Sequence, residues 1–162
     1  MSESLQINIS ADLDEQYILL IKQIKRLLNK NDHLTTNLAN LAAALKQTFS
    51  KISWVGFYLF DGEKLYLGPF QGKVACTEIK IGSGVCGTAA QKKETVIVYD
   101  VNKFPGHIAC DVDSKSEIVV PIFKDDKLFG VIDLDSTEYG SFNETDKIFL
   151  EEITDYLSKE II

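Results

Sequence analysis

Apolar residues change their spacing along the chain, and the changes predict where helices and strands lie. Over residues 13–28 and 34–49 they recur every three or four positions, which is typical of two amphipathic helices. From residue 52 onward they are denser and richer in aromatic and β-branched types, which favours strands. An Asp61-Gly62 turn joins 52–60 to 65–70 as a hairpin. We expect further strands over 74–81, 95–99, 117–123 and 128–134, a short helix over 85–92, and a final helix capped by Asn143 and Asp146.

This order of elements predicts an α+β domain built on a central, mostly antiparallel sheet. We expect the N- and C-terminal helices to cover one face of the sheet. The other face would carry the loops and a ligand pocket, including the long polar segment 100–116. Residues 1–12 are interpreted as an N-terminal extension and residues 13–162 as a single domain.

Composition narrows the class of protein. The chain has 162 residues, of which 45% are hydrophobic, so it can bury a core without a disulfide or metal staple. Its net charge of -7 argues against a nucleic-acid or anionic-membrane partner. We find neither a signal-peptide pattern nor an apolar run of membrane-spanning length, so we expect a cytoplasmic protein whose thiols are kept reduced.

The three cysteines are the first candidates for chemistry. Cys86 lies just inside the predicted helix, where the helix dipole would favour a thiolate. Cys110 lies in the long loop, and Cys76 lies within the predicted strand 74–81. Each could instead be a small buried hydrophobe. A zinc site is a further alternative because His107 and Cys110 have an H-x-x-C spacing, but the chain has no C-x-x-C pair, and we interpret His107 as a solvated loop residue.

Carboxylates and aromatic residues suggest a pocket on the sheet. Glu117 begins an apolar strand, and Asp133 and Asp135 interrupt another, where residues two apart share a face. Carboxylates inside apolar strands are costly unless they are paired or used. Trp54 and Tyr58 share one face of the first strand, with a glycine between them that leaves space for a small molecule. Ordinary core packing and a solvated sheet face are the alternatives.

These residues belong to segments by which the chain resembles a known family. It is similar to the free methionine-(R)-sulfoxide reductases, which are single GAF-domain enzymes, from about residue 52 to residue 136. The segments that carry the resemblance are 54–58 (WVGFY), 67–72 (LGPFQG), 82–87 (GSGVCG), 109–111 (ACD), 116–121 (SEIVVP) and 130–136 (GVIDLDS).

The resemblance implies roles for the candidate residues. The catalytic cysteine is Cys110, the resolving cysteine is Cys86, and Cys76 is an additional cysteine on the same redox path. Trp54 and Tyr58 line the pocket, and the substrate-binding carboxylates are Glu117, Asp133 and Asp135.

The implied reaction reduces free methionine-(R)-sulfoxide by thiol chemistry. A sulfenic acid forms and condenses to a disulfide, which thioredoxin reduces, and no metal or organic cofactor is needed. Either Glu117 or Asp133 would protonate the sulfoxide oxygen. The resemblance also implies a homodimer formed through terminal helices. A GAF domain that senses a small ligand, and a redox sensor without turnover, are the alternative functions.

Overall fold

The computed structural model describes residues 4–108 and 111–162. The helices are α1 (Leu13–Leu27), α2 (Leu34–Thr48), α3 (Gly84–Lys92) and α4 (Glu144–Tyr156), with short helical turns at Val101–Lys103 and Leu157–Ile161. The strands are β1 (Trp54–Phe60), β2 (Lys64–Gln71), β3 (Glu78–Lys80), β4 (Val96–Val98), β5 (Ser116–Lys124) and β6 (Lys127–Ser136).

The strands form one sheet in the order β3-β2-β1-β6-β5-β4. Every neighbouring pair in this order is antiparallel. The long strands β1, β6 and β5 occupy the middle of the sheet, and the short strands β3 and β4 form its edges. The predicted α+β class with a mostly antiparallel sheet is therefore confirmed.

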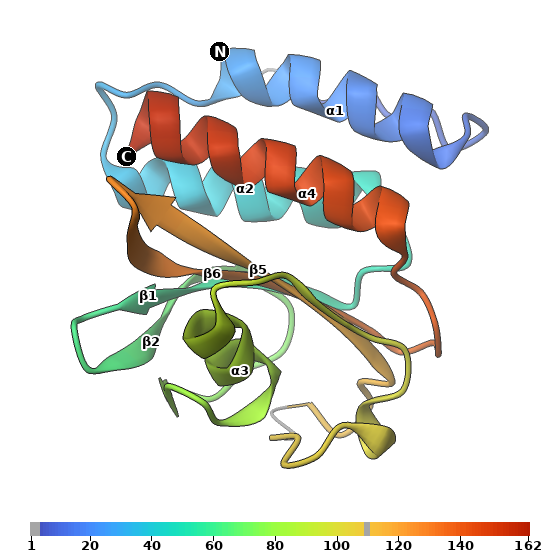
Figure 1. The fold of residues 1–162 in the computed structure, drawn as a ribbon. Helices are drawn as coiled ribbons and strands as arrows, with labels where there is room; N and C mark the ends of the chain where they lie inside the picture. Colours follow the sequence, from blue (N-terminus) through green and yellow to red (C-terminus); the bar gives the residue numbers. More distant parts are fainter. Residues whose placement is uncertain (1–3, 109–110) are drawn as a thin grey trace.

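Helices cover both faces of the sheet, but unequally (Figure 1). Helices α2 and α4 pack on one face, and α1 lies over these two helices on the side away from the sheet. The apolar residues of the three helices form a continuous core with β1, β5 and β6. Helix α3 lies on the opposite face together with the loop that follows β4. None of the helices formed by the described residues has the length and apolar character needed to cross a bilayer.

A buried polar contact ties the first helix to the last. The side chain of Asn143 caps α4 and forms a capping box with Asp146, as the sequence predicted. Asp146 is fully buried, accepts a hydrogen bond of 2.8 Å from the Tyr17 hydroxyl, and pairs with Lys51 Nζ at 2.7 Å. Because its charge is paired and hydrogen-bonded, this carboxylate is tolerated inside the helical layer.

The predicted strand over 74–81 is wrong in its first half, because β3 spans only Glu78–Lys80. The backbone turns out of β2 at Gly72, which has a φ of +138°. The carbonyls of Lys73 and Cys76 then accept hydrogen bonds from Trp54 Nε1 at 3.0 Å and the Tyr58 hydroxyl at 2.9 Å. Residues 72–77 therefore form a loop that is held to β1 by two aromatic side chains.

Candidate active site

Three carboxylic acids converge where β1, β6 and β5 lie side by side. Asp135 on β6 pairs in register with Trp54 on β1 and with Glu117 on β5. Asp133 pairs with Gly56 on β1, two positions along the same strand. Partners in register share a face of a sheet, so all five residues face the side on which α3 lies. The shared face of Asp133 and Asp135 was predicted from the sequence, whereas the alignment of Glu117 with Asp135 depends on the strand order.

Burial controls the protonation of these acids. Glu117 is 5% exposed and Asp133 is 6% exposed, so the solvated-face alternative is wrong for both. Burial, reinforced by the neighbouring acids, raises the pKa of each well above its usual value, and the two carboxyls are hydrogen-bonded to one another. Burial also raises the pKa of Asp135, but only to about 6, because the Ser114 hydroxyl donates a hydrogen bond to its Oδ1. At pH 7 the Glu117–Asp133 pair therefore retains a proton, while Asp135 is mostly ionised.

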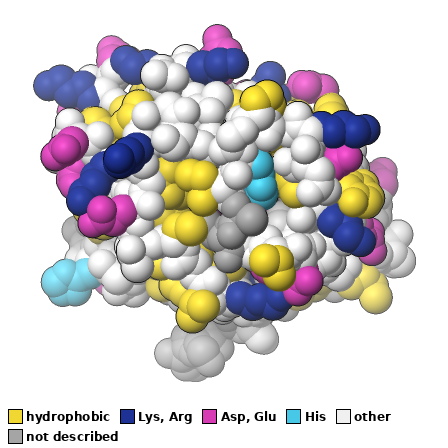
Figure 2. Space-filling view, turned by 90° about the horizontal axis from the view of Figure 1, so that it is seen from below, with side chains coloured by type: hydrophobic (Ala, Val, Ile, Leu, Met, Phe, Trp, Pro, Cys, Tyr) yellow, Lys and Arg dark blue, Asp and Glu magenta, His cyan; other side chains and the backbone are white. Residues whose placement is uncertain are grey.

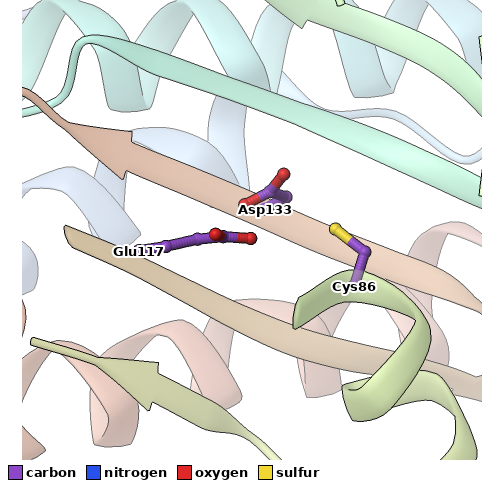
Figure 3. Close-up of side chains that lie close together, drawn as sticks. All are labelled: Cys86, Glu117 and Asp133. Atoms are coloured by element: carbon purple, nitrogen blue, oxygen red, sulfur yellow. The ribbon is translucent and has the colours of Figure 1, made fainter. Parts of the chain in front are cut away.

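Cys86 points from the first turn of α3 toward Glu117 and Asp133 (Figure 3). Its sulfur and one oxygen of each acid lie within 4.8 Å of one another. The thiol is free and 3% exposed. Burial, followed by the charges of Asp133 and Glu117, raises the pKa of Cys86 well above its usual value. The thiolate expected from the helix dipole is therefore disfavoured, because desolvation and negative neighbours outweigh the dipole.

The same three side chains could hold a metal ion once they lost their protons. A thiolate and two carboxylates suit a borderline cation such as Zn²⁺. This set differs from the H-x-x-C arrangement considered from the sequence, because the cluster found among the described residues does not include His107. Without an ion, the hydrogen bond between Glu117 and Asp133 already satisfies part of the hydrogen-bonding capacity of these two acids.

The other two cysteines do not belong to the buried cluster of Cys86, Glu117 and Asp133 that the described residues form. Cys110 lies outside the described residues. Cys76 is disulfide-bonded and partly exposed, in the loop that the Tyr58 hydroxyl holds through the Cys76 carbonyl. The structure thus distinguishes Cys76, a solvent-reachable disulfide cysteine, from Cys86, a buried free thiol. This arrangement disfavours the resolving role expected of Cys86.

Aromatic side chains build a wall beside the acids. The indole of Trp54 stacks on Phe70 with ring centroids 5.5 Å apart and lies 6.1 Å from the ring of Tyr58. Gly56 makes this packing possible, because a Cβ at this position would lie 2.4 Å from the Trp54 ring. A small hollow lies against Trp54, Tyr58, Asp133 and Asp135. The predicted aromatic pocket wall is therefore present next to the carboxyls.

A second hollow adjoins the first and includes residues that the sequence did not single out. Its lining includes Tyr58, Cys86, His107, Ser114 and the three acids. His107 is not a solvated residue as expected, because its side chain is 15% exposed and its Nε2 lies 3.4 Å from Glu117 Oε2. Burial lowers the pKa of His107, so this contact joins a neutral imidazole to the acids at pH 7. His107 and Ser114 lie in an irregular loop whose sequence shows no hydrophobic periodicity. Their positions next to the acids therefore could not be predicted from the sequence.

One carboxyl oxygen in this cluster has no hydrogen-bond partner. Among the residues that the structure describes, Asp133 Oδ1 is the buried side-chain oxygen that lacks one. Leaving such a group unpaired costs roughly 1–3 kcal/mol. The oxygen lies where both hollows reach the sheet, since Asp133 lines each of them. A polar group of a bound small molecule would satisfy it.

Comparisons with known proteins place this site in a family. The profile of the GAF domain family matches residues 32–161. "GAF domain-containing protein A" of Dictyostelium discoideum is 51% identical over 94% of this chain and 96% of that protein. The free methionine-R-sulfoxide reductase of Saccharomyces cerevisiae is 46% identical over 96% of this chain and 92% of that protein.

The fold agrees with the sequence comparison. The X-ray structure of free methionine-R-sulfoxide reductase from Neisseria meningitidis in complex with its substrate superposes with a TM-score of 0.92 at 44% identity. The match covers 96% of this chain and 93% of that one. The chain therefore belongs to the GAF domain family, in the group that contains the free methionine-R-sulfoxide reductases.

Proposed function

We propose that this protein reduces free L-methionine (R)-S-oxide to L-methionine. The observation that carries the proposal is the cluster of three acids, two of them buried and Asp135 partly buried, beside an aromatic wall, in a chain that is 46% identical to a reductase of this name. The substrate is small, carries an ammonium group and ends in an S-methyl sulfoxide. Each of these groups has a chemically suitable neighbour in the two adjoining hollows.

Asp135 is the partner that we assign to the ammonium group. Its pKa of about 6 makes it the acid that is ionised at neutral pH, and Ser114 fixes its orientation. A buried ammonium–carboxylate contact is strong because little water screens it. Trp54 and Tyr58 would enclose the S-methyl group and the side-chain stem. Peptide-bound methionine sulfoxide lacks the ammonium group, so this site would select the free amino acid.

Asp133 is the acid that we assign to the sulfoxide oxygen. Its raised pKa keeps it protonated with Glu117, and its unpartnered Oδ1 is available as the donor. The Cys110 thiolate attacks the sulfoxide sulfur and forms a sulfur–sulfur bond while Asp133 gives its proton to the sulfoxide oxygen. The oxygen then moves to the Cys110 sulfur as its bond to the substrate sulfur and the sulfur–sulfur bond break, which releases methionine and leaves a sulfenic acid on Cys110. The substrate gains two electrons and becomes the thioether, and the cysteine loses two.

Cys76 is our candidate for the resolving thiol, in place of Cys86. Its thiolate would attack the sulfur of the Cys110 sulfenic acid and release water, leaving a disulfide. The support is that Cys76 is disulfide-bonded and partly exposed, whereas Cys86 is a free, buried thiol whose raised pKa makes it a poor nucleophile. We further propose that thioredoxin reduces this disulfide in the cytoplasm.

The activity test is a coupled assay that follows NADPH oxidation by thioredoxin reductase and thioredoxin. Separated R and S epimers of free methionine sulfoxide are compared with a peptide-bound sulfoxide. Steady consumption with the free R epimer alone is expected, and Cys110→Ser should abolish it. A sensor without turnover would consume one equivalent or none, and full activity of Cys110→Ser would contradict the assignment of the nucleophile.

The two remaining cysteines form a matched pair for testing resolution. Cys76→Ser should still release one equivalent of methionine in a single turnover but should not cycle with thioredoxin. Cys86→Ser should cycle, because its thiol forms no disulfide in this scheme. If Cys86→Ser fails to cycle while Cys76→Ser turns over normally, Cys86 is the resolving thiol, as the family resemblance implies, and Cys76 is not.

A further inference from the structure

Two valines are unusually exposed on neighbouring loops. Val74 and Val112 are each 88% exposed, although they are apolar. The ammonium group of Lys73 joins the two loops by contacting Asp111 at 3.2 Å and Asp113 at 2.5 Å. Because these three charged residues are the immediate neighbours of the valines, the two apolar side chains emerge from adjacent segments. We call Val74 and Val112 the valine pair.

The valine pair flanks the redox cysteines. Val74 precedes the disulfide-bonded Cys76 by two residues, and Val112 follows Cys110 by two residues in the sequence. Figure 2 shows the face that carries α3 and the loops, where hydrophobic side chains gather near the centre and charged side chains lie mostly around the margin. Apolar side chains that stand exposed on such a face, as the valine pair does, are typical of a protein-binding surface.

The chemistry of the disulfide identifies the occupant of this surface. Each catalytic cycle leaves an oxidised cysteine pair that needs two electrons from outside the chain. A dithiol protein supplies them when its thiolate attacks one enzyme sulfur, which forms a mixed disulfide and releases the other sulfur as a thiolate that takes up a proton. The second thiol of the partner then breaks the mixed disulfide. This attack requires direct contact with the surface around Cys76, which is only partly exposed.

We propose that the valine pair is the docking surface for the dithiol protein that reduces this enzyme. The proposal rests on the proposed reductase function and adds the residues that recognise the partner. Two small apolar side chains beside the reactive sulfur would be buried by a flat apolar surface around the partner's thiol. Lys73 pairs with both Asp111 and Asp113, so these three charged groups leave a net charge of only −1 beside the valine pair. The interaction should therefore depend weakly on salt.

The experiment separates docking from chemistry by changing the reductant. Val74→Ser, Val112→Ser and the double variant are assayed with thioredoxin and, separately, with dithiothreitol, which needs no docking surface. The double variant should show about a tenfold rise in the KM for thioredoxin, as expected for loss of two central apolar contacts. Turnover of the Val112→Ser single variant with dithiothreitol should stay within about twofold of the wild-type rate, as is usual for a surface substitution. Val74 also lines the hollow beside the acids, so the double variant is judged by the ratio of its thioredoxin-driven to its dithiothreitol-driven turnover, which should fall. Ile148→Ser, which changes a 61% exposed isoleucine on α4, is the matched control and should change neither value.

A second measurement locates the contact directly. The complex is trapped as a mixed disulfide with a thioredoxin variant that lacks its second thiol, and hydrogen exchange is compared with the free enzyme. Protection of residues 72–76 and 111–114 is expected. An unchanged KM for thioredoxin in the double variant, or protection confined to α4, would overturn the docking surface. Absence of dithiothreitol-driven turnover in the wild-type protein would instead overturn the proposed function.

Discussion

The substitution Asp135→Asn should stabilise the free protein while damaging its activity. Asparagine has the shape of aspartate and keeps an oxygen that can accept the hydrogen bond from Ser114. It removes a carboxylate whose charge is largely desolvated beside two other acids. The free enzyme therefore loses an unfavourable charge, and the enzyme–substrate complex loses the partner of the ammonium group.

The size of the stabilisation follows from the pKa. Burial raises the pKa of Asp135 from its usual 3.8 to about 6, so the folded protein holds this proton more tightly than the unfolded chain. Stability from this group is thus complete below about pH 4 and falls as the pH rises to about 6. At about 1.4 kcal/mol per pKa unit, the wild-type protein loses about 3 kcal/mol across this interval. The asparagine variant loses none of it, which corresponds to a Tm about 6–12 °C higher at pH 8 for a chain of this length.

Thermal unfolding of both proteins between pH 4 and pH 8 tests this reasoning. The difference in Tm should be small at pH 4 and should grow to its full size above pH 6. A difference that is independent of pH would refute the link to ionisation. Asp113→Asn is the control, and its effect on the Tm should have the opposite sign. Lys73 lowers the pKa of this exposed acid, so its ionised form is favoured in the folded protein. In activity assays, kcat/KM of Asp135→Asn should fall about 30-fold or more, as is typical when one partner of a buried charge pair is removed.

Three further predictions concern the pocket and its ionisation. Gly56→Ala should raise the KM for methionine sulfoxide and lower the stability by roughly 1–3 kcal/mol, because the added methyl group collides with Trp54; unchanged kinetics and Tm would contradict the packing. The kcat/KM of the wild-type enzyme should fall as the pH drops below about 6, because Asp135 becomes protonated, and this acid limb should vanish in Asp135→Asn. Dialysis against EDTA should leave turnover intact, since the proposed chemistry uses only thiols and carboxyls, and a loss that Zn²⁺ restores would instead assign a working metal to the Cys86 cluster.

The parts of the site that could be predicted from the sequence follow from strand periodicity. Residues an even number of positions apart on one strand share a face, so Trp54 and Tyr58, which are four apart, and Asp133 and Asp135, which are two apart, could each be paired from their spacing alone. The aromatic pair on β1 and the acidic pair on β6 then lie side by side because the two strands are antiparallel neighbours, with Trp54 opposite Asp135 and Gly56 opposite Asp133.

The remaining features depend on contacts between distant segments. His107 and Ser114 contact the acids from an irregular loop. No local sequence pattern predicts the course of that loop. The chemistry of Cys86 depends on a balance between a favourable helix dipole and unfavourable burial among acids, and only the fold reveals that burial wins. The alternation over residues 74–81 predicts a strand that includes Cys76, but pairing with β2 begins only at Thr77, and the carbonyl of Cys76 accepts its hydrogen bond from the Tyr58 hydroxyl instead.

The hydrogen bonds from the aromatic wall to the loop 72–77 also give the protein an optical reporter. Trp54 is the single tryptophan of the chain. Its indole borders the hollow beside the acids on one side and holds the carbonyl of Lys73 on the other, three residues before Cys76. Ligand binding and rearrangement of the cysteine loop should both alter its fluorescence. Stopped-flow emission, without any added label, should therefore resolve substrate entry from the oxidation and reduction of the loop in real time.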